Sequence, residues 1–443
     1  MDIAEIPRYI VKEAEKQGVH TIVHATLMKR NQVRFANNVI TITNSWDEIL
    51  IKVYAEKDKK IAMFDLKDPR DDILEKAVKE LSHVVEKLKP NEDFYGVAQG
   101  PFEYKEIPET FDKKVVNLGE GLVDLAHASI NKALENGAKR VAGIVYATHS
   151  KDYSYGSNGL DAEQEGTWLE LTVRGFMEGY ASGMGVSVSR VLNKFEPEAA
   201  GAKAGKIAKD CEKQEQGEPG KYDVILSPAV FGNFINTVIM SANGFFYDSG
   251  LSFFMDKIGE KVASEKLTIT DSGVLPNGYE SRKYDSEGHP TQETVIIENG
   301  ILKGLLHNTS TAKKFDTEST GNAGDGIPRS WNSIVSPGSM TLDEMIQSVK
   351  KGIYVTSNWY TRFQNHQTGD FSTIPRDGIF LIKDGEIVGA IKEIRISENM
   401  LHVLQQIDEI GKNSEQIKWW EVDTSVLTPP VLIRDLNITR SKK

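Results

Sequence analysis

The sequence predicts an α+β fold in two parts: an N-terminal layered α/β unit with an antiparallel sheet, and a β-rich C-terminal domain, barrel- or sandwich-like, around a buried helix. Three observations predict it. The N-terminal alternating segments follow one another too closely for helical crossovers, two hairpins turn on Asn-Gly or Asp-Gly in the second half, and residues 229–242 are apolar almost all round. We expect domains at 1–190 and 222–443, with a helix and linker at 191–221 between them.

The composition is that of an ordinary globular protein. Of the 443 residues, 39% are hydrophobic and 26% charged, and the formal net charge is −11, so we expect neither nucleic acid nor a membrane as partner. No apolar run approaches the ~20 residues of a membrane span, and the N-terminus reads as an acid-bearing amphipathic helix rather than a signal peptide. Cys211 is the single cysteine, which excludes an intrachain disulfide and a thiolate metal cluster. We therefore expect a cytoplasmic protein.

The N-terminal unit begins with a helix at 6–17, which ends at Gly18. Period-2 alternation then predicts half-buried strands with a turn at Asn37-Asn38. These strands are 20–29, 32–37, 39–44, 48–55 and 60–66. An amphipathic helix at 71–88 and a Pro-bearing connector at 90–112 follow. The remaining elements are a helix at 120–136, a strand at 140–148, a turn-rich segment at 149–166, a strand at 167–176, a closely packed Gly-rich piece at 178–187 and a helix at 196–213.

The C-terminal part starts with a short strand at 223–226 and the apolar helix, for which Ser227-Pro228 supplies a cap and first turn and Asn243-Gly244 an end. A strand at 267–270 and hairpins at 295–308 and 379–397 follow. The stretches 317–339 and 358–378 read as long irregular loops, which are usually functional or mobile. Short helices at 342–351 and 398–409 and a strand-like tail complete the chain.

Three polar residues interrupt the apolar helix: Asn236, Thr237 and Ser241. On spacing alone they are small side chains that bond back to the preceding turn of a core helix. The nine histidines are scattered and no His-Glu-x-x-His occurs, so the residues by themselves indicate no metal site. Asp285 and Glu287 fit a tight turn with Gly288, and Asp370 fits a loop acid that caps its own backbone. No complete catalytic set is visible.

The order of several long motifs resembles the TldD/PmbA family of modulator-of-gyrase-type proteins. These motifs are ILSPAVFGNFINTVIMSANG, SFFMDKIGEKVASEKLTITDSG, YDSEGHPTQETVIIENGILKGLLHNTSTAKKF, STGNAG and TGDFS, followed by GIFLIKDGEIVGAIKEIRISENMLHVLQQIDEIG. The resemblance is strong from about residue 222 onward and looser before it. It implies a two-subunit metallopeptidase system.

In the TldD-type subunit the apolar helix carries His-Glu-x-x-x-His, and a cysteine near the C-terminus completes the zinc site. Transferred to this chain, those helix positions are Asn236, Thr237 and Ser241, and no cysteine follows position 211. Amide and hydroxyl side chains do not replace two imidazoles and a thiolate on Zn²⁺, and threonine is no general base. The resemblance therefore implies a PmbA (TldE)-type subunit with no metal or other cofactor of its own, and zinc only in a TldD-like partner.

The function implied is the non-metal subunit of a TldD/TldE-type cytoplasmic peptidase that acts on peptides or unfolded segments. Whether this chain is itself an enzyme stays open. One alternative is a peptide-binding or scaffold homo-oligomer without hydrolytic role, and another is a hydrolase with an unrecognised metal-free site at Asp285, Glu287 or Asp370. Partners are a TldD-like subunit or a second copy, and a peptide. The candidates for touching that peptide lie in two of the family motifs: Asn322, Asp370, Phe371 and Ser372.

Overall fold

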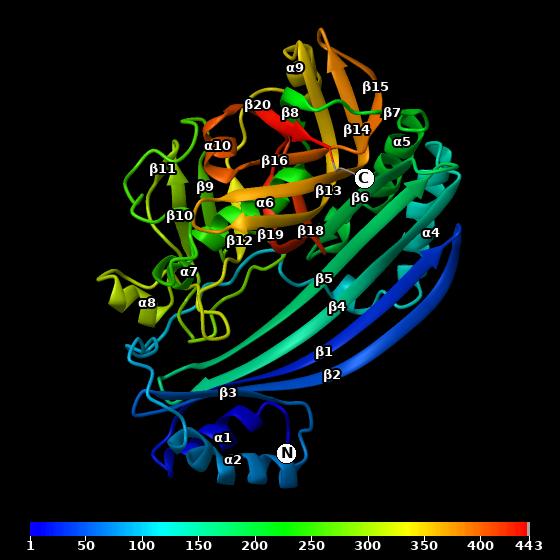
Figure 1. Ribbon diagram of the computed structural model, residues 1–443. Coiled ribbons are helices and arrows are strands. Elements are labelled where there is room, and N and C mark those ends of the chain that lie inside the picture. The colour runs from blue at the N-terminus through cyan, green and yellow to red at the C-terminus, as the bar shows by residue number, and fades with distance from the viewer. Residues whose placement is uncertain (441–443) are drawn as a thin grey trace.

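A six-stranded antiparallel sheet forms the N-terminal part of the computed structural model, which describes residues 1–440. Its strand order is β3-β2-β1-β4-β5-β6, and Figure 1 shows its long strands crossing beneath the C-terminal part of the molecule. The strands are β1 (His20–Ala36), β2 (Val39–Lys57), β3 (Lys60–Leu66), β4 (Arg140–Gly156), β5 (Asp161–Phe176) and β6 (Ser182–Ser189). The predicted turn at Asn37-Asn38 is confirmed, since both residues have positive φ.

The strands are longer than the sequence predicted. The breaks expected within 20–37 and 39–55 do not occur, because polar residues there stay in register with the neighbouring strand, Gln32 opposite Asn44 for example. The turn-rich segment expected at 149–166 is wrong for the same reason: Ser, Tyr and Asp side chains extend β4 and β5, and only residues 157–160 turn. Pairing across the sheet overrides weak strand propensity.

Helices cover one face of this sheet. α1 (Ile6–Glu15) and α2 (Asp71–Glu86) pack over one end, and α4 (Gly121–Glu135) and α5 (Pro197–Asp210) over the other. The short α3 (Lys113–Val116) and the 3₁₀ turn η1 (Leu192–Lys194) lie in connecting segments. The opposite face of the sheet looks toward the C-terminal part (Figure 1).

Two further sheets make up the C-terminal part. One has the order β11-β10-β9-β12-β19-β18, and the other is eight-stranded, β13-β8-β20-β16-β14-β15-β7, with β17 paired to β20. The strands of the first are β9 (Ile269–Ser272), β10 (Glu293–Glu298), β11 (Ile301–Leu302), β12 (Asn332–Val335), β18 (Glu415–Trp419) and β19 (Val422–Thr428). Those of the second are β7 (Gln214–Gln216), β8 (Gly220–Leu226), β13 (Lys351–Asn365), β14 (Asp370–Lys383), β15 (Glu386–Lys392), β16 (Arg395–Asn399), β17 (Ile407–Ile410) and β20 (Val431–Thr439).

The apolar helix α6 (Pro228–Ser241) lies between these sheets and contacts strands of both, among them β19 and β13. Its side chains Phe231 and Phe234 are fully buried within the main hydrophobic core. The predicted α+β class, with a sheet-rich C-terminal part around a buried helix, is therefore confirmed. The remaining helices are α7 (Gly244–Asp248), α8 (Thr309–Lys314), α9 (Leu342–Gln347) and α10 (Met400–Gln405).

Turn chemistry in the C-terminal part was predicted well. Both hairpins turn where expected, with positive φ at Asn299-Gly300 and at Asp384-Gly385. The loop expected at 358–378 is wrong: β13 and β14 pair there as a hairpin with register shifts, and Gly369 supplies a positive φ at its turn. Long alternation interrupted by bulges looks irregular in sequence alone.

The boundaries of α6 differ from expectation in one respect. Pro228 occupies the first turn, but the Ser227 hydroxyl does not cap the helix and instead donates to the Thr356 carbonyl at 2.7 Å. Asn243, expected to end α6, caps α7, its side chain accepting from the Phe245 amide at 2.9 Å.

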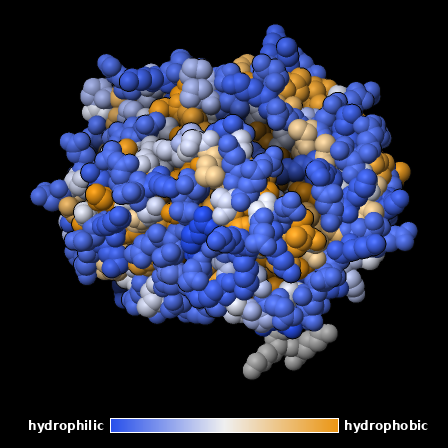
Figure 2. Space-filling model, turned by 90° about the horizontal axis from the view of Figure 1, so that it is seen from above, coloured by the Kyte–Doolittle hydropathy of each residue, from blue (hydrophilic) through white to orange (hydrophobic). Residues whose placement is uncertain are grey.

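The surface seen in Figure 2 is mostly hydrophilic, with apolar residues in separate patches. Among residues 1–440, no helix combines the length and apolarity that crossing a membrane requires.

Candidate functional site

Asn236, the first of the three polar residues of α6, bonds to a strand and not to its own helix. Its Nδ2 donates to the Thr424 carbonyl at 2.8 Å, and its Oδ1 accepts from the Thr424 amide at 3.0 Å. Both ends of the side-chain amide are thus used by the backbone of β19. The prediction that this residue bonds back to the preceding turn is wrong, because the backbone of β19 at Thr424 lies within reach.

The side chains of Thr237 and Ser241 make fewer hydrogen bonds than that of Asn236. The Thr237 hydroxyl lies 3.5 Å from the Asn233 carbonyl, one turn earlier, which is the predicted local bond at its longest. Ser241 is 3% exposed in the last turn, and its carbonyl accepts from the Ser252 hydroxyl at 2.6 Å. Each of the three positions therefore has a packing environment suited to a small polar side chain.

A fourth polar residue of α6, Asn233, joins the helix to the eight-stranded sheet and was missed by the sequence analysis. Its Oδ1 accepts from Asn358 at 2.9 Å and from the Thr361 hydroxyl at 2.6 Å, and its Nδ2 donates to the Glu421 carbonyl at 2.5 Å. The available signal was its spacing: residues three apart share a helix face, and Asn233 precedes Asn236 by three.

The candidate residues for touching a peptide lie in separate places. Asn322 is 1% exposed and donates to Asp271 at 2.7 Å and to the Arg329 carbonyl at 2.8 Å. Asp370 is exposed at the start of β14, where Thr368 and Asn399 donate to its carboxylate and lower its pKa. No hydrogen bond within residues 1–440 connects Asn322 to β14.

The other two β14 candidates point in opposite directions. Phe371 is 1% exposed and packs edge-on against Phe234 of α6, with ring centroids 5.1 Å apart. The Ser372 hydroxyl accepts from Arg395 at 2.9 Å. Phe371 thus lies in the core under α6, while contact with a peptide stays a prediction for all four residues.

Asp285 and Glu287 form a buried acidic pair. Asp285 accepts from the backbone amides of Glu287, His289 and Ala323, each at 2.9 Å, and this is the tight turn that the sequence predicts. Burial raises the pKa of Asp285 to about 7 despite these donors. Burial and the neighbouring Asp285 charge raise the pKa of Glu287, which accepts from the Ala98 amide at 3.1 Å.

Glu287 also borders a cavity of about 790 Å³ between β1–β3 and the α7–α8 region. Tyr54 lies in its wall, and the buried Tyr54 hydroxyl has no hydrogen-bond partner among the described residues. Lys314 at its rim pairs with Asp93 at 2.8 Å and with Asp248 at 2.7 Å. A mixed apolar and polar cavity of this size can accommodate a small organic ligand.

Comparison with known proteins identifies the family of this chain. The profile of the PmbA/TldA metallopeptidase C-terminal domain matches residues 219–440, which include α6 and every strand of the two C-terminal sheets except β7. This chain belongs to the TldD/PmbA family. The match begins at the start of β8 and therefore covers the part of the sequence in which the resemblance was strongest.

The sequence relatives include proteins named as metalloproteases. A metalloprotease of Methanothermobacter thermautotrophicus is 32% identical over 54% of this chain and 53% of its own length. A TldD homolog of Buchnera aphidicola is 34% identical over 43% of this chain and 41% of its own length. The chain thus matches about half the length of these curated relatives. An uncharacterised protein of Methanocaldococcus jannaschii is 28% identical over 86% and 88%.

Solved structures of the TldD/PmbA family share the whole fold. A protein described as a modulator of a DNA gyrase from Thermotoga maritima has a TM-score of 0.87 at 24% identity, over 98% of this chain and 99% of that one. TldE from Thermococcus kodakarensis has a TM-score of 0.87 at 22% identity, over 98% and 100%. At these identities the likeness concerns the fold.

The residues present do not fit the zinc that a TldD-type site implies. Asn236 has both amide atoms engaged by β19, and the side chains at 237 and 241 are hydroxyls. Among residues 1–440, no three His, Cys, Asp or Glu side chains converge as metal ligands. Cys211 is buried at the end of α5, where burial raises its pKa to about 12.

Proposed function

We propose that this chain is the non-metal-binding, TldE-like subunit of a TldD/TldE-type cytoplasmic peptidase, acting on peptides or unfolded segments. The observation that carries the proposal is the position of Asn236 on α6. Where the TldD-type helix has its first ligand, this chain has an amide bonded at both ends to Thr424. A histidine cannot make that pair of backbone bonds and also donate a lone pair to zinc.

The two subunits have different roles because only one of them carries the metal ligands. A metal-bearing TldD-like subunit performs the hydrolysis, and this chain completes the assembly and admits the substrate. The two-sheet core around α6 is intact, so the loss of ligand chemistry leaves the framework of the subunit in place. The role of this chain is therefore assembly with the TldD-like subunit. A measurement of binding between the two subunits can detect this role separately from peptide cleavage.

The test is co-expression with a TldD-type subunit that carries His-Glu-x-x-x-His. We expect the isolated chain to contain far less than one zinc per polypeptide and to cleave no peptide, and the co-purified complex to contain zinc and to cleave. A partner with its motif Glu changed to Gln serves as control, because the complex should form without cleaving. Stoichiometric zinc or peptidase activity in the isolated chain contradicts the proposal, and recovery of self-association alone favours the scaffold alternative.

A further inference from the structure

A second, half-open cavity of about 340 Å³ lies where the N-terminal sheet meets the segment between β9 and β10. Its floor is the sheet face opposite the helices. Three registered rows of side chains from β1, β4 and β5 form it, and because side chains alternate along a strand, all of them point to this face. The rows are Thr26, Asp152 and Gln164; Met28, Ser150 and Gly166; and Arg30, Thr148 and Trp168.

The wall of the cavity holds a buried guanidinium. Arg190, just after β6, is 2% exposed and stacks over the Trp168 ring, 4.1 Å from its centroid. It donates only to backbone carbonyls, among them those of Thr167 at 2.6 Å, Thr110 at 2.7 Å and Ser281 at 3.0 Å. These bonds satisfy its hydrogens but leave its charge without a counter-ion among the described residues.

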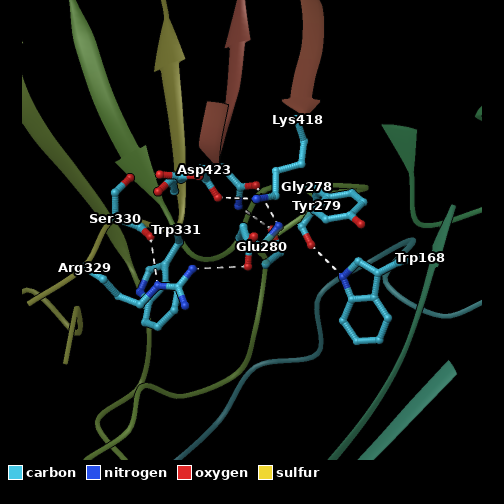
Figure 3. A network of polar contacts seen from close by, with 12 residues as sticks. Trp168, Gly278, Tyr279, Glu280, Arg329, Ser330, Trp331, Lys418 and Asp423 are labelled. Carbon is cyan, nitrogen blue, oxygen red and sulfur yellow. Dashed lines mark hydrogen bonds and ion pairs between the residues drawn. The ribbon is translucent and has the colours of Figure 1, made fainter. Parts of the chain in front are cut away.

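The segment between β9 and β10 closes the other side. Figure 3 shows Trp168 pointing its indole nitrogen at the Tyr279 carbonyl, a bond of 2.8 Å, and Glu280 turned toward Arg329. Gly166 on the floor has no side chain, and a Cβ there would collide with Arg190 and Trp168. The shape of the cavity is therefore fixed by rigid, well-packed groups.

Positive charges outnumber negative charges around the cavity. Four cations line it, Arg30, Arg190, Arg282 and Lys283, against three carboxylates, Asp152, Glu165 and Glu280. Two of the carboxylates have partners elsewhere: Glu165 bonds to His149 at 2.7 Å, and Glu280 pairs with Arg329 at 3.4 Å. Lys283 likewise pairs with Glu106 at 2.6 Å, which leaves three arginines and Asp152. In a chain of net charge −11, this is a locally positive site.

Two of the arginines are held in place without ion pairs. Arg30 stacks over the Tyr146 ring at 4.0 Å and Arg282 over the Trp331 ring at 4.7 Å. Within residues 1–440 neither forms a salt bridge, and the Nε of Arg30 is buried without a hydrogen-bond partner. Because neither arginine has an ion-pair partner, each can offer its charge to an anion in the cavity.

We propose that this cavity binds a carboxylate through Arg30 and Arg282, with Arg190 supplying additional positive charge, and that the ligand is the C-terminal carboxylate of a short peptide. Planar guanidinium groups match a carboxylate with two parallel hydrogen bonds. The hydroxyls of Thr148 and Ser150 on the floor offer bonds to the adjoining peptide unit. The choice of a peptide carboxylate rests on the proposed function, whereas the preference for an anion with oxygen acceptors rests on the arginines.

The test is calorimetric titration of the full chain with N-acetyl-Gly-Ala bearing a free C-terminus and with its C-terminal amide. We expect the acid to bind at least about 10-fold more tightly than the amide, and Arg30→Gln and Arg282→Gln each to weaken the acid about 10-fold or more. Arg34→Gln is the matched control, because Arg34 lies exposed further along the same strand and does not line the cavity. The Arg34→Gln variant should bind the acid with the same affinity as the unmodified chain.

Three results overturn the proposal: equal binding of acid and amide, unchanged binding by both arginine variants, or no binding at all. Inorganic phosphate binding as tightly as the dipeptide acid also overturns the assignment to a carboxylate, and acetate binding as tightly overturns the assignment to a peptide. Should a glutamine variant unfold, Arg30→Lys keeps the charge but loses the planar fork, and should still weaken the acid. Zinc in the isolated chain would defeat the proposed function and leave this titration unaffected, so the two failures are distinguishable.

Discussion

At the scale of single residues, the polar positions of α6 differ in the bonds that they make to the rest of the protein. Asn236 makes two backbone bonds to β19, and Asn233 ties the same helix to β13. Thr237 contributes one long bond within the helix. Asn233, Asn236 and Thr237 therefore contribute differently to the stability of the protein, although all three are polar residues of the same apolar helix.

Asn236→Ala should lower the free energy of unfolding by about 1–3 kcal/mol, because the amide and carbonyl of Thr424 lose their partners in a half-buried place. Thr237→Ala is the matched control on the same helix. It removes only a 3.5 Å bond and replaces threonine by a better helix former, so its effect should stay within about 0.5 kcal/mol. Urea denaturation of both variants measures the difference, and equal losses would contradict the role assigned to Asn236.

Restoring the TldD-type residues with Asn236→His, Thr237→Glu and Ser241→His should not create a peptidase. No cysteine follows position 211 to serve as the third ligand, and Ser241 is 3% exposed, so a histidine there overpacks the core. We expect no peptide cleavage with added zinc and a lower melting temperature. Cleavage by the triple variant would mean that a ligand elsewhere in the chain completes the site.

At the scale of elements, the packing of α5 requires a glycine at position 201, whereas the packing of α6 leaves room for a side chain at position 232. Gly201 on α5 faces the Ser129 backbone of α4, where a Cβ would collide with the carbonyl oxygen. Gly232 on α6 is different, because a Cβ there would meet Val426 at 3.6 Å and Ile417 at 3.7 Å, which is ordinary contact. The same residue type thus has opposite roles in two helices of the molecule.

Gly232→Ala should stabilise the protein by about 0.5–1 kcal/mol, because alanine loses less backbone entropy in a helix and fits the space. Gly201→Ala should destabilise it by about 1–3 kcal/mol, because α4 and α5 must separate. Thermal melts of the two variants provide the comparison. A destabilising Gly232→Ala would show that α6 has no room against β18 and β19.

At the scale of the whole molecule, the buried residue Glu287 connects the two parts. Glu287 accepts from the connector at Ala98 and from the start of α8 at Thr309, and the Glu287 carbonyl accepts from Asn158 of the N-terminal part. Burial raises the pKa of Asp271 to about 6 and that of both Asp285 and Glu287 to about 7. These three acids therefore stabilise the folded protein more when they are protonated than when they are ionised.

The sign of the resulting pH dependence is fixed by these shifts. The folded-state pKa values lie above the ordinary values of 3.8 and 4.5, so the folded protein holds extra protons between about pH 4 and pH 7. The contribution of these groups to stability is complete at the low end of that window and is lost as the pH rises through it.

Glu287→Gln should flatten this dependence by up to one proton, about 1.4 kcal/mol per pH unit, and should make the protein more stable than the unmodified chain above pH 7. Glutamine keeps an oxygen that accepts from Ala98 and Thr309. Denaturant unfolding between pH 4 and 8 measures the slope, with the exposed Glu293→Gln as control. An unchanged slope would show that Glu287 is ionised throughout.

Residue identity and local pattern predicted the α+β class, the burial of α6, the Asn-Gly and Asp-Gly hairpins and the amide and hydroxyl side chains at 236, 237 and 241. Each of these depends on residue identity or on neighbours within a few positions. Only the tertiary structure decided the continuous lengths of β1, β2, β4 and β5, the bond from Asn236 to a residue 188 positions away, and the meeting of Arg30, Arg190 and Arg282 in one cavity. These depend on which distant surfaces bury one another, and no local periodicity records that choice.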